Sequence, residues 1–169
     1  MAMSAILLGE FDQEFGNTRR VLERIPEGKF DWKPHERSMN LGRLATHLTE
    51  LALWCSHTFE RTELDLAPPG APPYQPVTLS TRAAILAALD ENVRRARALL
   101  AAATDADFMV PWSLKRGGAT IFTLPRIAVY RSFVMNHMIH HRAQLGVYLR
   151  LNDVPVPALY GPTADERPM

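Results

Sequence analysis

The segment Asn136–Leu145, with the sequence NHMIHHRAQL, carries three histidines within five residues. Successive residues of a helix are about 100° apart, so His137 and His141 share one face, while His140 leans away from them. Two imidazoles one turn apart can bind the same metal ion. The spacing therefore predicts His137 and His141 as a metal-binding pair. The alternative is two ordinary helix histidines that are satisfied by hydrogen bonds.

A third histidine, His47, falls in the middle of another predicted helix, between the apolar residues Leu44 and Leu51. An imidazole without a partner is costly in such a place. Helical bundles build ligand sites from side chains on facing helices, and His47 can face the last helix in this way. A set of three histidines leaves coordination positions open for water or substrate, as catalytic zinc sites do. We therefore predict a metal site formed by His47, His137 and His141.

Three further residues are candidates for the surroundings of this site. Glu50 follows His47 by three residues and could accept the second N–H of its ring, as acceptors near metal ligands commonly do. Gln144 lies one turn from His141 and could bond a ligand or a metal-bound water. Tyr160, in the tail, could fold back towards the open end of the site. For each of them, an ordinary packing or solvent contact remains the alternative, and no role is assigned to His140.

The elements that must position these residues follow from hydrophobic periodicity and from the placement of proline and glycine. Apolar stripes predict helices at 3–25, 41–61, 81–103 and 125–151. A proline-rich connection separates the second and third helices, and the residues around Gly117 and Gly118 predict a small hairpin before the last helix. We expect one domain over residues 1–169. Its predicted fold class is all-α, a four-helix bundle with this hairpin.

The composition limits the classes of partner. The chain has 169 residues, 47% of them hydrophobic and 22% charged, with a net charge of +1. This balance gives no electrostatic indication of binding to nucleic acid or to an anionic membrane. A single cysteine, Cys55, fits a reducing compartment, and the first residues do not form a secretion signal. We therefore expect a cytoplasmic protein that acts on a small molecule.

The predicted last helix is apolar on nearly every side. A helix of this kind must be buried on every side, which in a small bundle requires a second subunit. The sequence thus favours a homodimer. Cys55 could approach the metal site, although a buried, unreactive thiol is the commoner outcome for such a residue.

Three segments together resemble the DinB-like superfamily of metal-binding bundle proteins. They are IPEGKFDWKPHERSMNLGRLATHLTEL, NHMIHHRAQLGVYLRLNDVPVP and LYGPTADE, in the order found in that family. The resemblance implies an up-down-down-up topology, commonly a homodimer, and a divalent metal, often zinc or nickel. It places the ligands at His47, His137 and His141, and Gln144 also matches the family motif. Some similar proteins are transferases or isomerases that use a low-molecular-weight thiol.

The leading hypothesis is therefore a divalent-metal-binding protein that is a metal-dependent enzyme. It would be a thiol-dependent transferase or a hydrolase that acts on a small molecule through the three histidines. The alternative is a metal-binding stress-response or interaction protein without catalysis. A third reading, in which the histidines are structural and bind no metal, is the weakest of the three.

Overall fold

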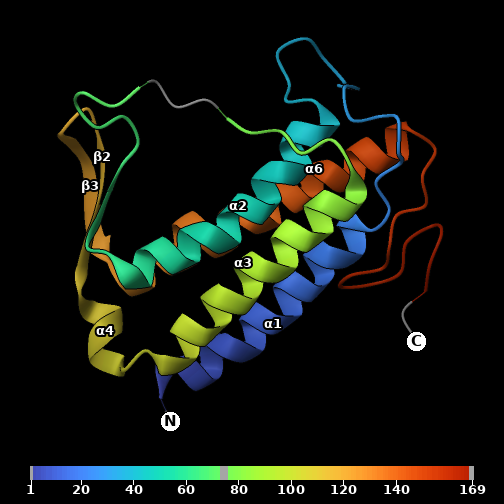
Figure 1. Ribbon diagram of the computed structural model, residues 1–169. Coiled ribbons are helices and arrows are strands. Elements are labelled where there is room, and N and C mark those ends of the chain that lie inside the picture. The colour runs from blue at the N-terminus through green and yellow to red at the C-terminus, as the bar shows by residue number, and fades with distance from the viewer. Residues whose placement is uncertain (1, 73–75, 168–169) are drawn as a thin grey trace.

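The computed structural model describes residues 2–72 and 76–167, and it shows four long helical segments packed side by side (Figure 1). The segments are α1 (Met3–Leu22), α2 (Leu41–Glu60), α3 (Arg82–Ala102), and a last one made of α5 (Arg126–Val129), η1 (Tyr130–Asn136) and α6 (His137–Leu151). Helix α1 and the last segment run in one direction, and α2 and α3 run in the other. Helices α3 and α6 each pack against both α1 and α2.

Side-chain caps begin α2 and α3. The Asn40 side chain accepts a hydrogen bond from the Arg43 backbone N–H over 2.8 Å and so begins α2. Thr81 does the same for Ala84 at the start of α3. Both caps satisfy an N–H that has no partner inside its own helix. The register of α2, and with it the direction of its side chains, is therefore set from its first turn.

The interior of the bundle is a continuous apolar core contributed by every long helix. Its fully buried members include Phe11, Leu22, Leu44, Leu51, Ile85, Leu89, Leu145 and Leu149. Burying a side chain of this kind stabilises the fold by about 1.5–3 kcal/mol. The core gives α2 and α6 the rigid contact on which a site between them depends.

The last helical segment is not one regular α-helix. Residues Tyr130–Asn136 form a π-helix, whose wider turns advance by a smaller angle per residue than the 100° assumed from the sequence. Tyr130 consequently turns into the core, where its hydroxyl donates to the Leu7 carbonyl over 3.4 Å. Segments of π-helix often occur at functional sites. Here the segment ends where His137 begins α6.

The expected all-α class is wrong, because a three-stranded mixed sheet stands at one end of the bundle (Figure 1). The strands are β1 (Glu63–Asp65), β2 (Pro111–Arg116) and β3 (Ala119–Pro125), and a short helix, α4 (Asp105–Met109), precedes β2. Strands β2 and β3 are antiparallel around Gly117 and Gly118, both with positive φ. Strand β1 pairs in parallel with β2. With only three residues, β1 has too little alternation to be found by periodicity.

The sheet has a small core of its own, made of Trp112, Leu114 and Val129. The Trp112 indole N–H donates to the His57 carbonyl over 3.3 Å and ties the sheet to the C-terminal half of α2. Strand β1 lies at the start of the proline-rich connection, and residues 73–75 of that connection lie outside the described residues.

None of the described helices is long and apolar enough to cross a membrane.

Candidate metal centre

Three imidazoles from two helices meet beside the core. The Nε2 atom of His137 lies 2.9 Å from Nε2 of His141 and 3.4 Å from Nε2 of His47. One ring nitrogen from each residue lies within 4.8 Å of those of the other two. His141 is buried and the other two are half-buried. Tertiary packing of α2 against α6 thus brings together the three residues that the sequence analysis selected.

The outer nitrogen of each ring is held by a hydrogen-bond acceptor. The Nδ1 atom of His47 lies 2.9 Å from Glu50 Oε2, and that of His141 lies 2.7 Å from Gln144 Oε1. The Nδ1 atom of His137 lies 3.3 Å from the backbone carbonyl of Phe133. Because a carboxylate and a carbonyl oxygen only accept, each Nδ1 carries the hydrogen and donates it. All three Nε2 atoms therefore point bare lone pairs at one another.

The partner of His47 is an ionised carboxylate within a small charged network. Burial raises the pKa of Glu50, but hydrogen bonds from His47 and Arg43 outweigh it and leave that pKa below its usual value. Arg43 binds both carboxylate oxygens, at 3.0 and 2.7 Å. Glu50 is therefore negatively charged at neutral pH, fixes the orientation of the His47 ring and increases its basicity.

The rings of His137 and His141 are neutral at physiological pH. Burial, helped by the neighbouring His141 and His47, lowers the pKa of His137 to about 4. Burial also lowers the pKa of His141, against the opposing effect of its hydrogen bond to Gln144. A neutral imidazole is the form that binds a metal, so protons do not compete for these nitrogens near pH 7.

The donor set fits a divalent transition-metal ion. Nitrogens about 2.0–2.1 Å from a tetrahedral zinc lie about 3.3 Å from each other, close to the two Nε2 separations found here. Three lone pairs that face each other without a hydrogen between them repel, and a cation among them would remove that repulsion. Imidazole ligands suit zinc, nickel and copper better than magnesium or calcium, which prefer oxygen.

The remaining predicted residues fall in two places. Gln144 touches His141, and its side-chain nitrogen also lies 3.1 Å from Nε2 of the exposed His140. Tyr160, for which the sequence left both possibilities open, makes its contacts away from the histidines. Its hydroxyl donates to Glu14 over 2.6 Å and accepts from Arg142, so it joins the buried ion pair between α1 and α6 through charge-assisted hydrogen bonds.

Cys55 also stays away from the chemistry. Its side chain is fully buried in the bundle core, and burial raises the pKa of the thiol to about 12. The thiol is therefore protonated at neutral pH and does not act as a nucleophile or as a metal ligand. This agrees with the alternative of a buried, unreactive cysteine.

A cavity of about 770 Å³ opens from the site towards the sheet. One wall is a single face of α2, formed by Arg43, His47, Glu50, Trp54 and His57. The other wall comes from β1, the residues after it and the end of β2, and contains Leu64, Leu66 and Arg116. Its volume is that of a typical small-molecule site.

The basic residues Arg43, His57 and Arg116 line this cavity but were not among the candidates predicted from the sequence. The first two could have been found, since positions 43, 47, 50 and 57 recur at helical spacing and place charged or imidazole side chains on one face of the helix. His57 is half-buried, and burial lowers its pKa. Arg116 carries no such signal, because only the packing of the sheet brings it to the cavity.

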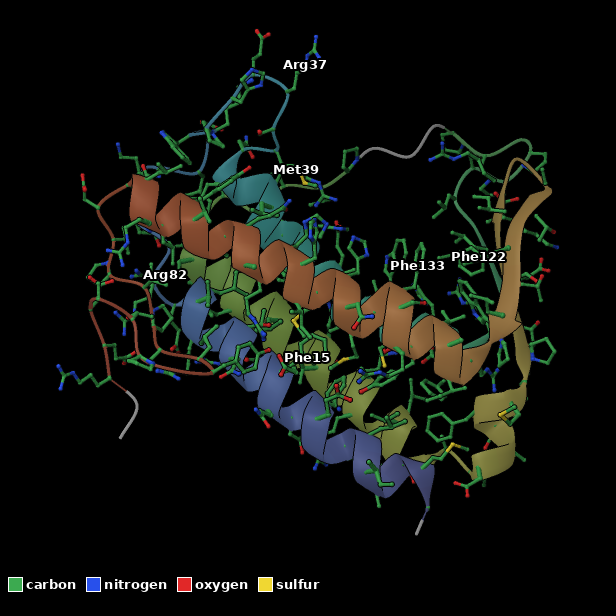
Figure 2. All side chains as sticks on the ribbon, turned by 180° about the vertical axis from the view of Figure 1, so that it is seen from behind. Phe15, Arg37, Met39, Arg82, Phe122 and Phe133 are labelled. Carbon is green, nitrogen blue, oxygen red and sulfur yellow. The ribbon has the colours of Figure 1, made fainter. Side chains whose placement is uncertain are left out.

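Aromatic rings separate this cavity from a shallower hollow on the far side of His137. The rings of Trp54 and Phe133 stack with centroids 5.2 Å apart, and Phe122 of β3 packs against Phe133 (Figure 2). Trp54 lines the large cavity, whereas Phe133 and His137 line the hollow, whose volume is about 380 Å³. The histidine cluster thus lies at the junction of two openings.

Comparison with known proteins agrees with these features. A family model described as the DinB superfamily matches residues 10–145. A DinB-like protein from Bacillus cereus ATCC 10987 has a similar structure, with a TM-score of 0.69, 18% identity, and coverage of 94% of this chain and 98% of that one. The DinB-like protein YjoA from Bacillus subtilis is also similar, with a TM-score of 0.68, 20% identity, and coverage of 90% of this chain and 95% of that one. At these identities the likeness concerns the fold alone. No curated protein matches the chain.

Proposed function

This chain belongs to the DinB superfamily, and from that premise we propose that it is a divalent-metal-dependent enzyme acting on a small molecule. His47, His137 and His141 would hold the ion, with zinc or nickel as the favoured metals. The observation that carries the proposal is the convergence of three Nε2 lone pairs, each fixed by an acceptor on the opposite ring nitrogen. A chance cluster of histidines would have no reason to orient all three rings alike.

The protein side chains supply orientation and protection from water. Glu50, Gln144 and the Phe133 carbonyl hold the rings in the tautomer that leaves Nε2 free. Trp54 and Phe133 form an apolar wall beside the cluster, between its two openings. When bound, a divalent ion in such a site supplies Lewis acidity and lowers the pKa of bound water or thiol towards neutrality.

The reaction class that we propose is thiol-dependent transfer or hydrolysis. Three protein ligands are typical of catalytic sites, because structural zinc sites use four. The cavity beside His47 offers room for a small substrate, with a low-molecular-weight thiol as a candidate co-substrate. The thiol follows from the resemblance of the motifs to those of thiol-using relatives.

A second candidate is a protein that binds the metal without catalysis. The observation that favours it is the state of Glu50, whose two oxygens are occupied by Arg43 and His47. Glu50 is therefore not free to act as a general base. In this reading the protein would serve in a stress response or an interaction.

We also propose that the protein is a cytoplasmic homodimer. Val147 and Leu151 lie one turn apart on α6 with exposed fractions of 58% and 56%. Burying apolar residues of this size against a second copy would be favourable. The buried, unoxidised Cys55 fits a reducing compartment.

The primary test is metal analysis of protein purified without an immobilised-metal column. We expect about one divalent ion per chain in the wild type, and a loss of at least about tenfold in affinity for His47→Ala and His137→Ala. His35→Ala, in an exposed loop, is the matched control and should keep the wild-type content. Circular dichroism would show that each variant is folded. A metal-free wild type, or ligand variants with full metal content, would contradict the site.

Catalysis is tested separately with the metal-loaded protein. A panel of low-molecular-weight thiols with electrophilic acceptors, and a panel of activated esters, would be assayed with the wild type and with His141→Ala. We expect turnover that depends on His141 with at least one pair. Equal rates for the two proteins throughout both panels would favour the second candidate.

A further inference from the structure

The cavity beside the histidines has an uneven distribution of charge. Of its two arginines, Arg43 is neutralised by the bidentate contact with Glu50. Asp65, its second acidic residue, is held by the backbone N–H groups of Gly117 and Gly118, at 3.0 and 2.7 Å. Over residues 2–72 and 76–167, no carboxylate lies within ion-pair distance of Arg116. Arg116 is therefore the arginine of this cavity that makes no ion pair within the described residues.

The same contacts fix where Arg116 lies. It is the last residue of β2, pairs with Ala119 across the turn, and precedes the two glycines that Asp65 holds. Asp65 also accepts from the Ala67 N–H over 2.9 Å, which braces the chain just after β1. The turn and the cavity wall are thereby joined, and the backbone that carries Arg116 is braced at the edge of the cavity.

The space between this rim and the histidines is apolar. Leu53 and Trp54 line it from α2, and Leu64 and Leu66 line it from the sheet side. Along α2 the cavity extends from His47 to His57, ten residues or about 15 Å of helix. A ligand that fills it would meet the metal ligand His47 at one end, apolar walls along its body, and a free guanidinium at the mouth.

We propose that the cavity binds an elongated small molecule with an apolar body and a terminal carboxylate, which Arg116 receives while the reacting group lies at the histidines. This inference rests on the proposed metal site and adds the class of substrate. A guanidinium is suited to this role, since its planar fork matches a carboxylate through two N–H donors. Arg116 would act as a binding and positioning residue at a distance from the reacting atoms.

The test uses zinc-loaded protein and a probe with two ends. Suberic acid monohydroxamate carries a metal-binding hydroxamate at one end and a carboxylate at the other, and its monoamide analogue lacks only the charge. Calorimetric titration would compare the two. We expect the wild type to bind the carboxylate on the order of tenfold more tightly than the amide, because a guanidinium makes stronger hydrogen bonds to a charged carboxylate than to a neutral amide.

In Arg116→Gln this preference should fall to about twofold or less, with amide binding and zinc content unchanged, and Arg116→Lys should restore part of it. Arg37→Gln is the matched control. It removes another exposed arginine, which lies on the loop before α2 and far from the sheet (Figure 2), so the preference should persist. A wild type that binds both probes equally, or an Arg116→Gln variant that keeps the preference, would overturn the inference.

These outcomes separate the inference from the function beneath it. Equal binding of both probes by protein that holds zinc refutes the carboxylate end and leaves the metal site intact. Protein that holds no zinc refutes the metal site. In that case the carboxylate end is tested in the same protein with suberic acid monoamide, which has one carboxylate, and with the diamide, which has none. A preference for the monoamide that Arg116→Gln loses supports the inference. Equal binding of the two probes overturns it.

Discussion

His47 and Glu50 lie one turn apart on α2, with the imidazole N–H donated to a carboxylate that Arg43 also binds (2.9 Å from Nδ1 to Oε2). The contact sets the tautomer of His47 and directs its Nε2 towards α6. Glu50 therefore connects the histidine cluster to the cavity, since Arg43, His47 and Glu50 all line it.

Loss of this contact should weaken metal binding without abolishing it. We expect Glu50→Ala to reduce zinc affinity about 10–100-fold, because the His47 ring loses its orientation and part of its basicity. Competition with a chromogenic chelator would measure the change. Glu91→Ala, which removes an exposed glutamate bound to Arg94 on α3, is the control. An affinity that Glu50→Ala leaves intact would show that Glu50 does not support His47.

The stability of the metal-free protein should depend on pH through His137. Its pKa in the folded state is about 4, below the value of 6.5 for an unfolded chain, so the unfolded state binds more protons between these limits. The contribution of this residue is fully present above pH 6.5 and is lost as the pH falls towards 4. We expect a loss of about 1–2 kcal/mol, reduced because the ring is half exposed to solvent.

Urea unfolding between pH 7 and about pH 4.5 would measure this effect. His137→Asn should be less sensitive to pH than the wild type, whereas His35→Asn should follow the wild type. If His137→Asn and the wild type lose the same free energy over this range, His137 is not the group that titrates.

The buried ion pair of Glu14 and Arg142 should matter far more for stability than an exposed pair on the same helix. Both side chains are buried, with exposed fractions of 8% and 2%. Glu14→Gln leaves the guanidinium without a counter-charge and should destabilise the fold by about 3–5 kcal/mol.

Asp12→Asn provides the matched control, since it breaks the exposed pair with Arg97 and should cost under about 1 kcal/mol. Chemical denaturation of both variants would give the comparison. Similar losses for the two variants would mean that Arg142 finds another partner in the Glu14 variant, with Tyr160 as the nearest candidate.

The proposed dimer should depend on the exposed apolar residues of α6. A glutamate at position 147 would place a charge within that face, so Val147→Glu should convert the dimer to a monomer at micromolar concentration. Light scattering coupled to size-exclusion chromatography would report the mass. Val77→Glu, at an equally exposed valine away from α6, should leave the mass unchanged. A wild-type monomer would refute the dimer outright.

The four helices and the histidine trio were accessible from the sequence for a local reason. An apolar stripe shows which face of a helix is buried, and the four-residue spacing of His137 and His141 places both rings on one side. His47 stood out because an imidazole within an apolar stripe needs a partner. Glu50 and Gln144 lie within one turn of their histidines, so their contacts also follow from local geometry.

Tertiary structure alone decided the rest, because the contacts involved join distant parts of the chain. Strand β1 exists through backbone pairing with β2, some fifty residues later, and its three side chains carry no pattern of their own. The position of Tyr160 was settled by the Glu14–Arg142 pair between two helices. Arg116 reaches the cavity only because the sheet stands beside the C-terminal half of α2. The sequence by itself therefore determined which residues can hold a metal, and packing determined the cavity beside them and what that cavity can accept.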